Sequence, residues 1–373
     1  MSILLASTLI AALDFGIQPL PEDSKFRKEN FTKYTEIIAP NGKSIPIIAQ
    51  QGVRDIAIAR AKNLLQFFLT DVPNSEFGKD KSAVANAMAN NKALLMMPEG
   101  AHREGREPRI EAQPLYESET PIDGSQWYIK NNWEHRDAAF EEIFHLVHDT
   151  GIGTYLKGAL PHYQTQLKVE SRKALNEHRW GIPVDPHVKQ WIEELRQEQS
   201  LAQEYIASVL DSYYGLWAAF DEEPGGMWGV YIAKTREEIK TKDPNGLKLI
   251  EAFLPPMMYG YEALIDPSFN GTFYMQLNDD FPYTFKSQYL VDVTLNGKTN
   301  ANILGNKEDN TFKGNAGNNI INGGDGNDTV IFEGVPDEYE ISTVGSTTKV
   351  KDLKANRGGV DTLISIEQLQ FKE

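Results

Sequence analysis

The sequence predicts an α+β domain, mostly helical with a small mixed sheet, followed by a short parallel β-roll and a β cap. Three observations support this fold class. Apolar residues recur at steps of three and four in several segments of the first part, as in amphipathic helices. Short apolar runs between them predict strands. After Tyr289 the composition changes abruptly to Asn, Gly and Asp with a nine-residue period. We therefore expect two domains, residues 1–285 and 286–373.

Composition excludes several classes of function. The chain has 373 residues, of which 37 are Lys or Arg and 53 are Asp or Glu, so its formal net charge is −16. This charge disfavours a broad phosphate-binding surface, and we expect no nucleic-acid partner. The absence of cysteine excludes disulfides, cysteine nucleophiles and thiolate metal sites. A bound metal must therefore be held by His, Asp, Glu or carbonyl oxygen.

The apolar stretch at residues 3–13 is too short to cross a bilayer, and Asp14 follows it directly. No Lys or Arg precedes it, as a secretory signal would require. We expect a helix or strand packed on the body, with a signal peptide as the alternative, and no membrane span.

The first elements are read from periodicity. Residues 52–69 carry apolar side chains at helical spacing and predict a buried helix. Residues 93–97 and 126–129 predict short strands, separated by a polar stretch with two further extended pieces. A second helix is expected from near His135 to just before Gly151.

Two more helices are expected further along the chain. Residues 170–178 are predicted to be helical. Pro186 opens a longer helix that continues to Trp217, with apolar side chains at steps of three and four.

Four nonapeptides follow, at residues 296–304, 305–313, 314–322 and 323–331. The eighth place of each unit is apolar, and these residues are Ile303, Phe312, Ile321 and Val330. Such a unit forms a Gly-rich turn of six residues and a three-residue strand with one side chain in a stacked core. Since two units make one coil, the turns at 305–310 and 323–328 stack on the same side.

The turns offer oxygen ligands of the kind that Ca²⁺ prefers, namely carbonyls and a carboxylate in sixth place. Only the last unit has that carboxylate, Asp328. The pattern resembles the haemolysin-type (RTX) calcium-binding repeat, GGxGxDxUx, which residues 323–331 match fully. We expect one Ca²⁺ between the two stacked turns, and its ligands would be Asp328, Asp325, Asn310 and the carbonyls of Gly323 and Gly305. A metal-free coil of Asn ladders is the alternative.

The RTX resemblance covers roughly residues 290–373, and the tail after the repeats looks like the cap that ends many RTX proteins. It implies export through a type I secretion machinery that reads the C-terminus, with folding triggered by external Ca²⁺. The expected location is extracellular or at the cell surface.

The segment 135–153 holds three of the seven histidines. At about 100° per residue, Glu141, His145 and His148 lie on one stripe of a helix, and Glu142, His145 and Asp149 lie on the adjacent one. Zinc peptidases use the HExxH pattern because residues i and i+4 present two ligands to one ion, with the Glu between them as general base. Residues 141–145 show that pattern with Glu in place of the first His.

The region of about residues 50–220 resembles the zincins, and residues 135–153 correspond to their motif helix. The segment around Glu204 and the residues that follow the motif are similar to those of lethal-factor-like gluzincins. The resemblance implies that Glu141, His145 and Glu204 bind Zn²⁺ or another divalent ion and that Glu142 is the general base. Tyr213 or Tyr214 would donate to the developing oxyanion, and a strand near Trp127 would be the substrate-binding edge.

Alternatives remain for this helix. If Glu141 faces solvent, His148 replaces it as a ligand beside His145 and Glu204, and Asp149 orients an imidazole. His135 could hydrogen-bond Glu142. A plain amphipathic helix with a hydrogen-bonded histidine is also compatible with the pattern.

The expected function is that of a secreted metal-dependent hydrolase, a peptidase acting on an extracellular protein or peptide substrate. The alternative is a non-catalytic extracellular calcium-binding or surface-associated recognition protein with a degenerate peptidase-like body.

Overall fold

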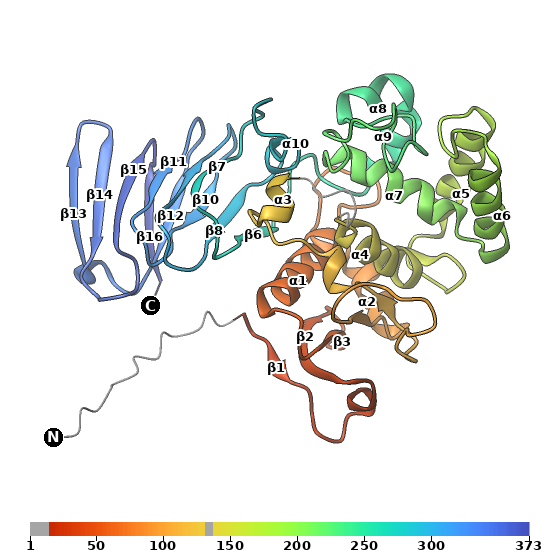
Figure 1. Cartoon of the computed structure of the whole chain (residues 1–373), viewed down its shortest axis with the longest axis horizontal. Helices are drawn as coiled ribbons and strands as arrows, with labels where there is room; N and C mark the ends of the chain where they lie inside the picture. Colours follow the sequence, from red (N-terminus) through yellow and green to blue (C-terminus); the bar gives the residue numbers. More distant parts are fainter. Residues whose placement is uncertain (1–14, 131–136, 373) are drawn as a thin grey trace.

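The computed structural model describes residues 15–130 and 137–372. A mixed α/β body carries the helices, and a roll of parallel strands lies beside it (Figure 1). The element expected at residues 3–13 and the start of the helix expected near His135 lie outside the described residues.

The body contains the small mixed sheet that the sequence predicts. The strand order is β1 (Gln18–Pro19), β2 (Phe31–Ile38), β3 (Ser44–Gln50), β4 (Leu95–Met97) and β5 (Gln113–Pro114). The first three strands are antiparallel, whereas β3, β4 and β5 run parallel. The strand expected at residues 93–97 is confirmed as β4.

The strand expected at residues 126–129 is wrong, because these residues form helix α3 (Gln126–Lys130). A four-residue apolar run has too few positions to separate a strand from a helical turn. Here Ser125 begins the helix, since its hydroxyl accepts a hydrogen bond from the Tyr128 amide at 3.3 Å. The last strand of the sheet is β5, and it replaces the region around Trp127 as the open edge.

The described body has many more helical residues than strand residues. Besides α3, the described helices are α1 (Asp55–Leu69), α2 (Ser82–Asn90), α4 (Ala139–Val147), α5 (Pro161–Asn176), α6 (Pro186–Glu198), α7 (Leu201–Tyr213), α8 (Arg236–Lys242), α9 (Pro244–Glu251) and α10 (Thr284–Ser287). A π-helix, η4 (His148–Gly153), continues α4, and 3-10 turns occur at η1 (Lys25–Glu29), η2 (Glu117–Glu119) and η5 (Pro336–Glu338).

The helix expected at 52–69 is confirmed by α1, apart from its first residues. The helix expected at 170–178 is confirmed in part by α5, which begins nine residues earlier, at Pro161. The single long helix expected from Pro186 to Trp217 is wrong. It is divided into α6 and α7 because Gln199 adopts a left-handed conformation, with φ of 62°, and caps α6. The break turns the start of α7 toward α5.

The C-terminal part is the expected parallel β-roll with a β cap. One sheet has the order β16 (Gln368–Lys372), β12 (Thr329–Glu333), β10 (Thr311–Lys313), β8 (Asp292–Leu295) and β6 (Glu262–Ile265). The other has the order β13 (Tyr339–Val344), β14 (Thr347–Asp352), β15 (Val360–Ile364), β11 (Ile320–Asn322), β9 (Ala301–Leu304) and β7 (Gly271–Tyr274).

The nine-residue register is confirmed, since the eighth-place residues Ile303, Phe312, Ile321 and Val330 are all at most 1% exposed. The antiparallel strands β13, β14 and β15 form the cap. The roll begins with β6 and β7, before the boundary expected at 285/286, and its core is continuous with that of the body.

Candidate metal centre and calcium-binding turns

Helix α4 has an apolar face that determines where its acidic residues point. Phe140 and Phe144 pack on Phe68 of α1, at ring distances of 6.2 and 5.3 Å. With that face buried against α1, Glu141 and His145 lie toward α7, which packs along the other side of α4. The motif therefore faces the interior between two helices.

Glu141, His145 and Glu204 converge. Each offers a ligand atom, and these atoms all lie within 4.8 Å of one another. Glu141 is 3% exposed and His145 is 6% exposed, whereas Glu204 is half-buried. His145 Nε2 lies 3.6 Å from Glu204 Oε1 and makes no hydrogen bond to any described residue. A buried nitrogen in this state, between two carboxylates, suits a divalent cation that accepts mixed nitrogen and oxygen ligands.

The electrostatics of His145 show how acidic this cluster is. Burial lowers the pKa of an imidazole, but Glu204, Glu142 and Glu141 outweigh burial and raise the pKa of His145 to about 10. The protonated imidazole of His145 therefore provides a positive charge beside the carboxylates of Glu141, Glu142 and Glu204. A divalent ion would supply it instead, with His145 as a neutral ligand.

Glu142 lies on the neighbouring stripe and is partly open to solvent. Its Oε2 accepts a hydrogen bond of 2.6 Å from Gln113 Nε2 on β5 and lies 3.7 Å from His145 Nδ1. Sequence patterns did not point to Gln113, which lies in a polar, Pro-containing stretch without periodicity. The open edge strand of the sheet thus holds the carboxylate that the sequence predicts as general base.

His148 and Asp149 are not brought into the cluster. His148 is fully buried and its Nε2 lies 2.6 Å from Gln164 Oε1 on α5, while burial lowers its pKa to about 4. His145 and His148 are three residues apart, so their side chains point about 60° apart around the helix axis. His145 therefore faces α7, whereas His148 faces α5. The Asp149 carboxylate accepts hydrogen bonds from Gln203 and Thr154 rather than from an imidazole.

Tyr213 and Tyr214 do not reach the cluster either. The Tyr213 hydroxyl donates to Glu251 at 3.3 Å, and the Tyr214 hydroxyl donates to the Pro255 carbonyl at 2.6 Å. Both side chains are at most 1% exposed. Tyr213 is nine residues beyond Glu204, roughly 13 Å along α7. The expected oxyanion donors instead belong to the core. The expected contact of His135 lies outside the described residues.

In the roll, Asp328 has one carboxylate oxygen without a hydrogen-bond donor among the described residues. One of its oxygens, Oδ1, accepts a hydrogen bond of 2.8 Å from the Asn310 amide, whereas Oδ2 is buried with no hydrogen bond to a described residue. A β-carbon on Gly323 would lie 2.1 Å from Asp328 Oδ2 and 2.2 Å from the Ser365 carbonyl oxygen. Asp328 Oδ2 and the Ser365 carbonyl oxygen thus lie close to the same side of Gly323, and no described hydrogen-bond donor reaches Asp328 Oδ2. Such a pair of oxygens suits a bound cation.

Three of the other expected calcium ligands, Asn310, Gly305 and Asp325, are placed differently. Oδ1 of Asn310 accepts a hydrogen bond from the Asn306 amide, and the Gly305 carbonyl accepts one from Gln276 Nε2 at 2.8 Å. The Asp325 side chain is exposed. Ser365 belongs to the connection before β16 and has no repeat signature, so the sequence did not identify it.

Asparagine ladders hold the other turns. Asn310 Nδ2 donates to the Val291 carbonyl, and Asn319 Nδ2 donates to the Ala301 carbonyl. On the second side, the Asn319 amide donates to Asp361, whose pKa burial raises to about 7. Each of the two stacks of turns therefore ends at a buried aspartate, Asp328 or Asp361. In the other turns, the side-chain amides of asparagines donate to the backbone carbonyls.

Comparison with known proteins agrees with this geometry. Residues 298–334 match the family described as RTX calcium-binding nonapeptide repeat, four copies. This segment is an RTX repeat module. No curated protein matches the chain.

One solved structure is similar over much of the chain, the extracellular lipase LipA from Serratia marcescens. It shares 12% identity, with a TM-score of 0.19, and the match covers 92% of this chain and 55% of that protein. The chain thus spans about half the length of that lipase. None of the described helices combines the length and apolar character of a membrane-spanning helix.

We expect Ca²⁺ to stabilise the RTX module through Asp328. At a free concentration 100-fold above its Kd, one ion contributes about 2.7 kcal/mol. The Asp328→Asn variant should lose this gain, because it removes the charged ligand. Without calcium the variant should be at least as stable as the wild type, since asparagine occupies the sixth place of two other turns. Thermal unfolding with and without a calcium chelator measures both effects.

The matched control for this prediction is Asp337→Asn, in the exposed η5 turn. It should keep the full response to calcium. A melting temperature of the wild type that does not change on chelation would contradict the assignment.

Proposed function

We propose that the protein is a secreted metal-dependent hydrolase that cleaves peptide bonds, with a divalent ion held by Glu141, His145 and Glu204. The observation that carries this proposal is the convergence of three ligand atoms within 4.8 Å, from two helices far apart in the sequence. Imidazole nitrogen and carboxylate oxygen are ligands of Zn²⁺ in catalytic sites, where the bound ion acts as a Lewis acid.

Glu142 is the proposed general base. Its carboxylate lies beside the cluster, is partly accessible to water, and is oriented by Gln113. A carboxylate in this position can take a proton from an attacking water and return it to the leaving amine. Gln113 belongs to β5, the last strand in the described sheet order, so an extended polypeptide could pair along its open edge.

The RTX module supports an extracellular location. Proteins with such repeats bind Ca²⁺ outside the cell, and their usual route is a type I secretion machinery that reads the C-terminus. A substrate that is an extracellular protein or peptide follows from this location. We also propose that the body has a zincin-like fold.

Metal analysis tests the proposal directly. Protein stripped of zinc and manganese and then reloaded should bind one equivalent of ion, as measured by mass spectrometry. The His145→Ala variant should bind it more than about 100-fold more weakly, since loss of an outer-shell partner alone costs 10–100-fold. His162→Ala, which alters an exposed histidine of α5, is the control. A wild type that retains calcium but neither zinc nor manganese contradicts the proposal.

A second function is favoured by one specific feature, the carboxylate of Glu141 in place of an imidazole. Two carboxylates and one imidazole leave a bound ion less Lewis-acidic than two imidazoles do. The body would then be a non-catalytic recognition domain whose metal is structural. Retention of the metal without any turnover that depends on Glu142 favours this alternative.

A further inference from the structure

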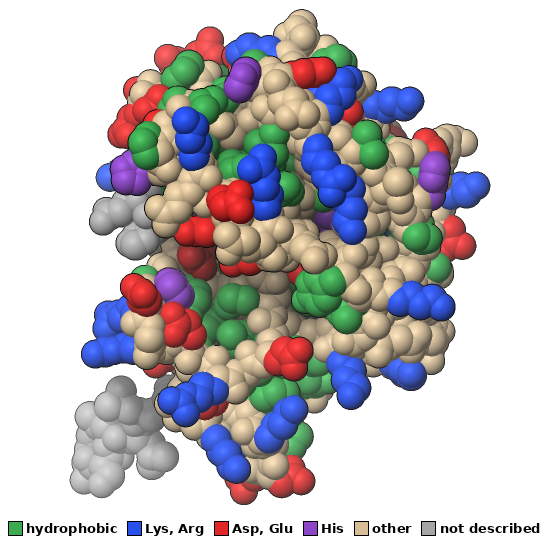
Figure 2. Space-filling view, turned by 90° about the vertical axis from the view of Figure 1, so that its right-hand side faces the viewer, with side chains coloured by type: hydrophobic (Ala, Val, Ile, Leu, Met, Phe, Trp, Pro, Cys, Tyr) green, Lys and Arg blue, Asp and Glu red, His purple; other side chains and the backbone are tan. Residues whose placement is uncertain are grey.

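A basic cavity of about 450 Å³ lies between α5, the end of α6 and the start of α7. The residues that matter for its chemistry are Lys168, Arg172, Arg196, Leu201 and Ala202. No Asp or Glu of the described chain lines it, although the protein carries a net charge of −16. Figure 2 views the molecule from the side of α5 and α6, and shows several Lys and Arg side chains above a hollow where acidic side chains lie.

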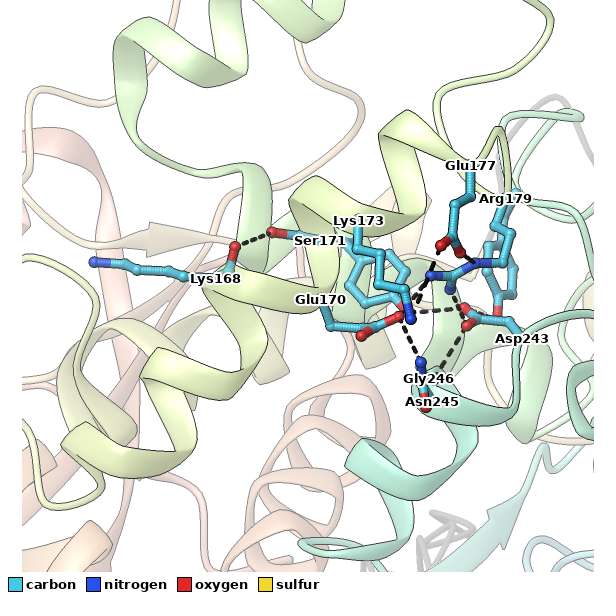
Figure 3. Close-up of polar contacts among 11 residues, drawn as sticks. Lys168, Glu170, Ser171, Lys173, Glu177, Arg179, Asp243, Asn245 and Gly246 are labelled. Atoms are coloured by element: carbon cyan, nitrogen blue, oxygen red, sulfur yellow. Dashed lines mark hydrogen bonds and ion pairs between the residues drawn. The ribbon is translucent and has the colours of Figure 1, made fainter.

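The two cations on α5 lack the partners that their neighbours have. Arg179, for example, is neutralised by Glu170 at 2.6 Å and by Asp243. In the described part of the chain, neither Lys168 nor Arg172 has a carboxylate within ion-pair distance. The side chain of Lys168 extends away from the cluster around Arg179 (Figure 3). These two charges are therefore available to a ligand.

The start of α7 adds to the positive potential. Leu201 and Ala202 are its first two residues, and their amides have no acceptor within the helix. Ser200, at the N-cap, does not cap them, because its hydroxyl donates to the Leu195 carbonyl. Arg196 contributes less, since it pairs with Glu193 at 3.3 Å. Two free cations and a helix N-terminus around one cavity form a site for an anion.

The cavity and the candidate metal centre share helix α7. Ala202 is two residues before Glu204, a rise of about 3 Å along α7, and the two side chains leave the helix on opposite sides. Lys168 is one turn beyond Gln164, which contacts His148 on the side of the helix that faces α5. A polypeptide bound at the metal centre would pass around the N-terminal end of α7 to place a side chain in this cavity.

We infer that the cavity binds an acidic side chain, Asp or Glu, of the polypeptide substrate. The inference rests on the proposed function, because it assigns a specificity pocket to that site. A single carboxylate experiences the local positive field within about 10 Å, whereas an extended polyanion is repelled by the net negative charge of the whole protein.

Binding of two matched peptides tests the pocket without relying on catalysis. The peptides have the same length and differ only in a Glu-Glu or a Gln-Gln pair. Binding is measured by calorimetry with the wild-type protein in a zinc chelator that leaves calcium in place. The acidic peptide should bind at least about tenfold more tightly, as expected for a hydrogen bond to a charged group. Lys168→Gln and Arg172→Gln should each remove most of this preference.

Lys173→Gln is the control, because Lys173 lies on the same helix and pairs with Glu177 at 3.9 Å, outside the cavity. Equal affinity for the two peptides, or a preference that Lys168→Gln and Arg172→Gln leave intact, overturns the inference. Binding of a phosphoserine peptide but not of the Glu-Glu peptide also overturns it. A selective protein that cleaves neither peptide after zinc is restored supports the pocket but contradicts the proposed hydrolase. Cleavage of both peptides with no difference in affinity supports the proposed hydrolase but contradicts the pocket.

Discussion

Replacement of Glu142 by glutamine should lower peptide turnover by about 10³-fold, within the range that a general base contributes. Glutamine has the same shape and keeps an oxygen that can accept the hydrogen bond from Gln113 Nε2. It cannot take a proton from water. Since Glu142 is not one of the three converging ligands, the bound metal should stay at one equivalent. Cleavage of casein or a labelled peptide, with metal content measured on the same sample, checks both outcomes.

The control for this variant is Glu194→Gln, an equivalent change at an exposed position of α6. Its turnover should equal that of the wild type. Full activity in Glu142→Gln would exclude this residue as the base. Loss of the metal together with the activity would instead make Glu142 a ligand.

The second large effect is expected in the core, where Arg60→Met should destabilise the protein by about 3–5 kcal/mol, the cost of breaking a buried ion pair. Arg60 is 1% exposed and makes two hydrogen bonds to the Asp137 carboxylate, at 3.1 and 2.7 Å. Its Nε lies 3.7 Å from Asp123, whose other contacts include a hydrogen bond from Tyr261. Without the arginine, two buried carboxylates lose their positive partner. Chemical denaturation measures the change.

Arg54→Met provides a matched control on the same stretch of chain. Arg54 also pairs with an aspartate, Asp266, at 2.9 Å, but its side chain is 52% exposed. We expect a change of less than about 1 kcal/mol. A comparable loss in both variants would contradict the argument from burial.

The Arg60 cluster also connects the parts of the molecule. Arg60 lies on α1, Asp137 precedes α4, and Tyr261 leads into β6, the first strand of the roll. Arg60→Met should therefore lower the stability of body and roll together. Unfolding followed by circular dichroism and by tryptophan fluorescence should give coincident transitions, since a shared core couples the two parts.

Some features missed by the sequence analysis had a local signal. The hairpin of β2 and β3 is an example, because Asn41-Gly42 lies between two runs rich in β-branched and aromatic residues. The break between α6 and α7 had a weaker signal, the S-x-x-Q pattern of Ser200 and Gln203 at the start of α7. Gln199 has a positive φ, which favours Gly or Asn, and the apolar spacing continues across it.

Local periodicity predicts the features that belong to a single repeat or a single helix. The nine-residue repeat specified which residues enter the core of the roll, and the helical spacing put Glu141 and His145 on one face. Which residues lie opposite this face of α4 depends on the tertiary structure. It brings Glu204 from α7 and Gln113 from β5 to α4, turns His148 toward Gln164, and commits Tyr213 and Tyr214 to the core. The reason is physical: periodicity defines the direction of a side chain relative to its own element, whereas the packing of apolar faces determines which elements become neighbours.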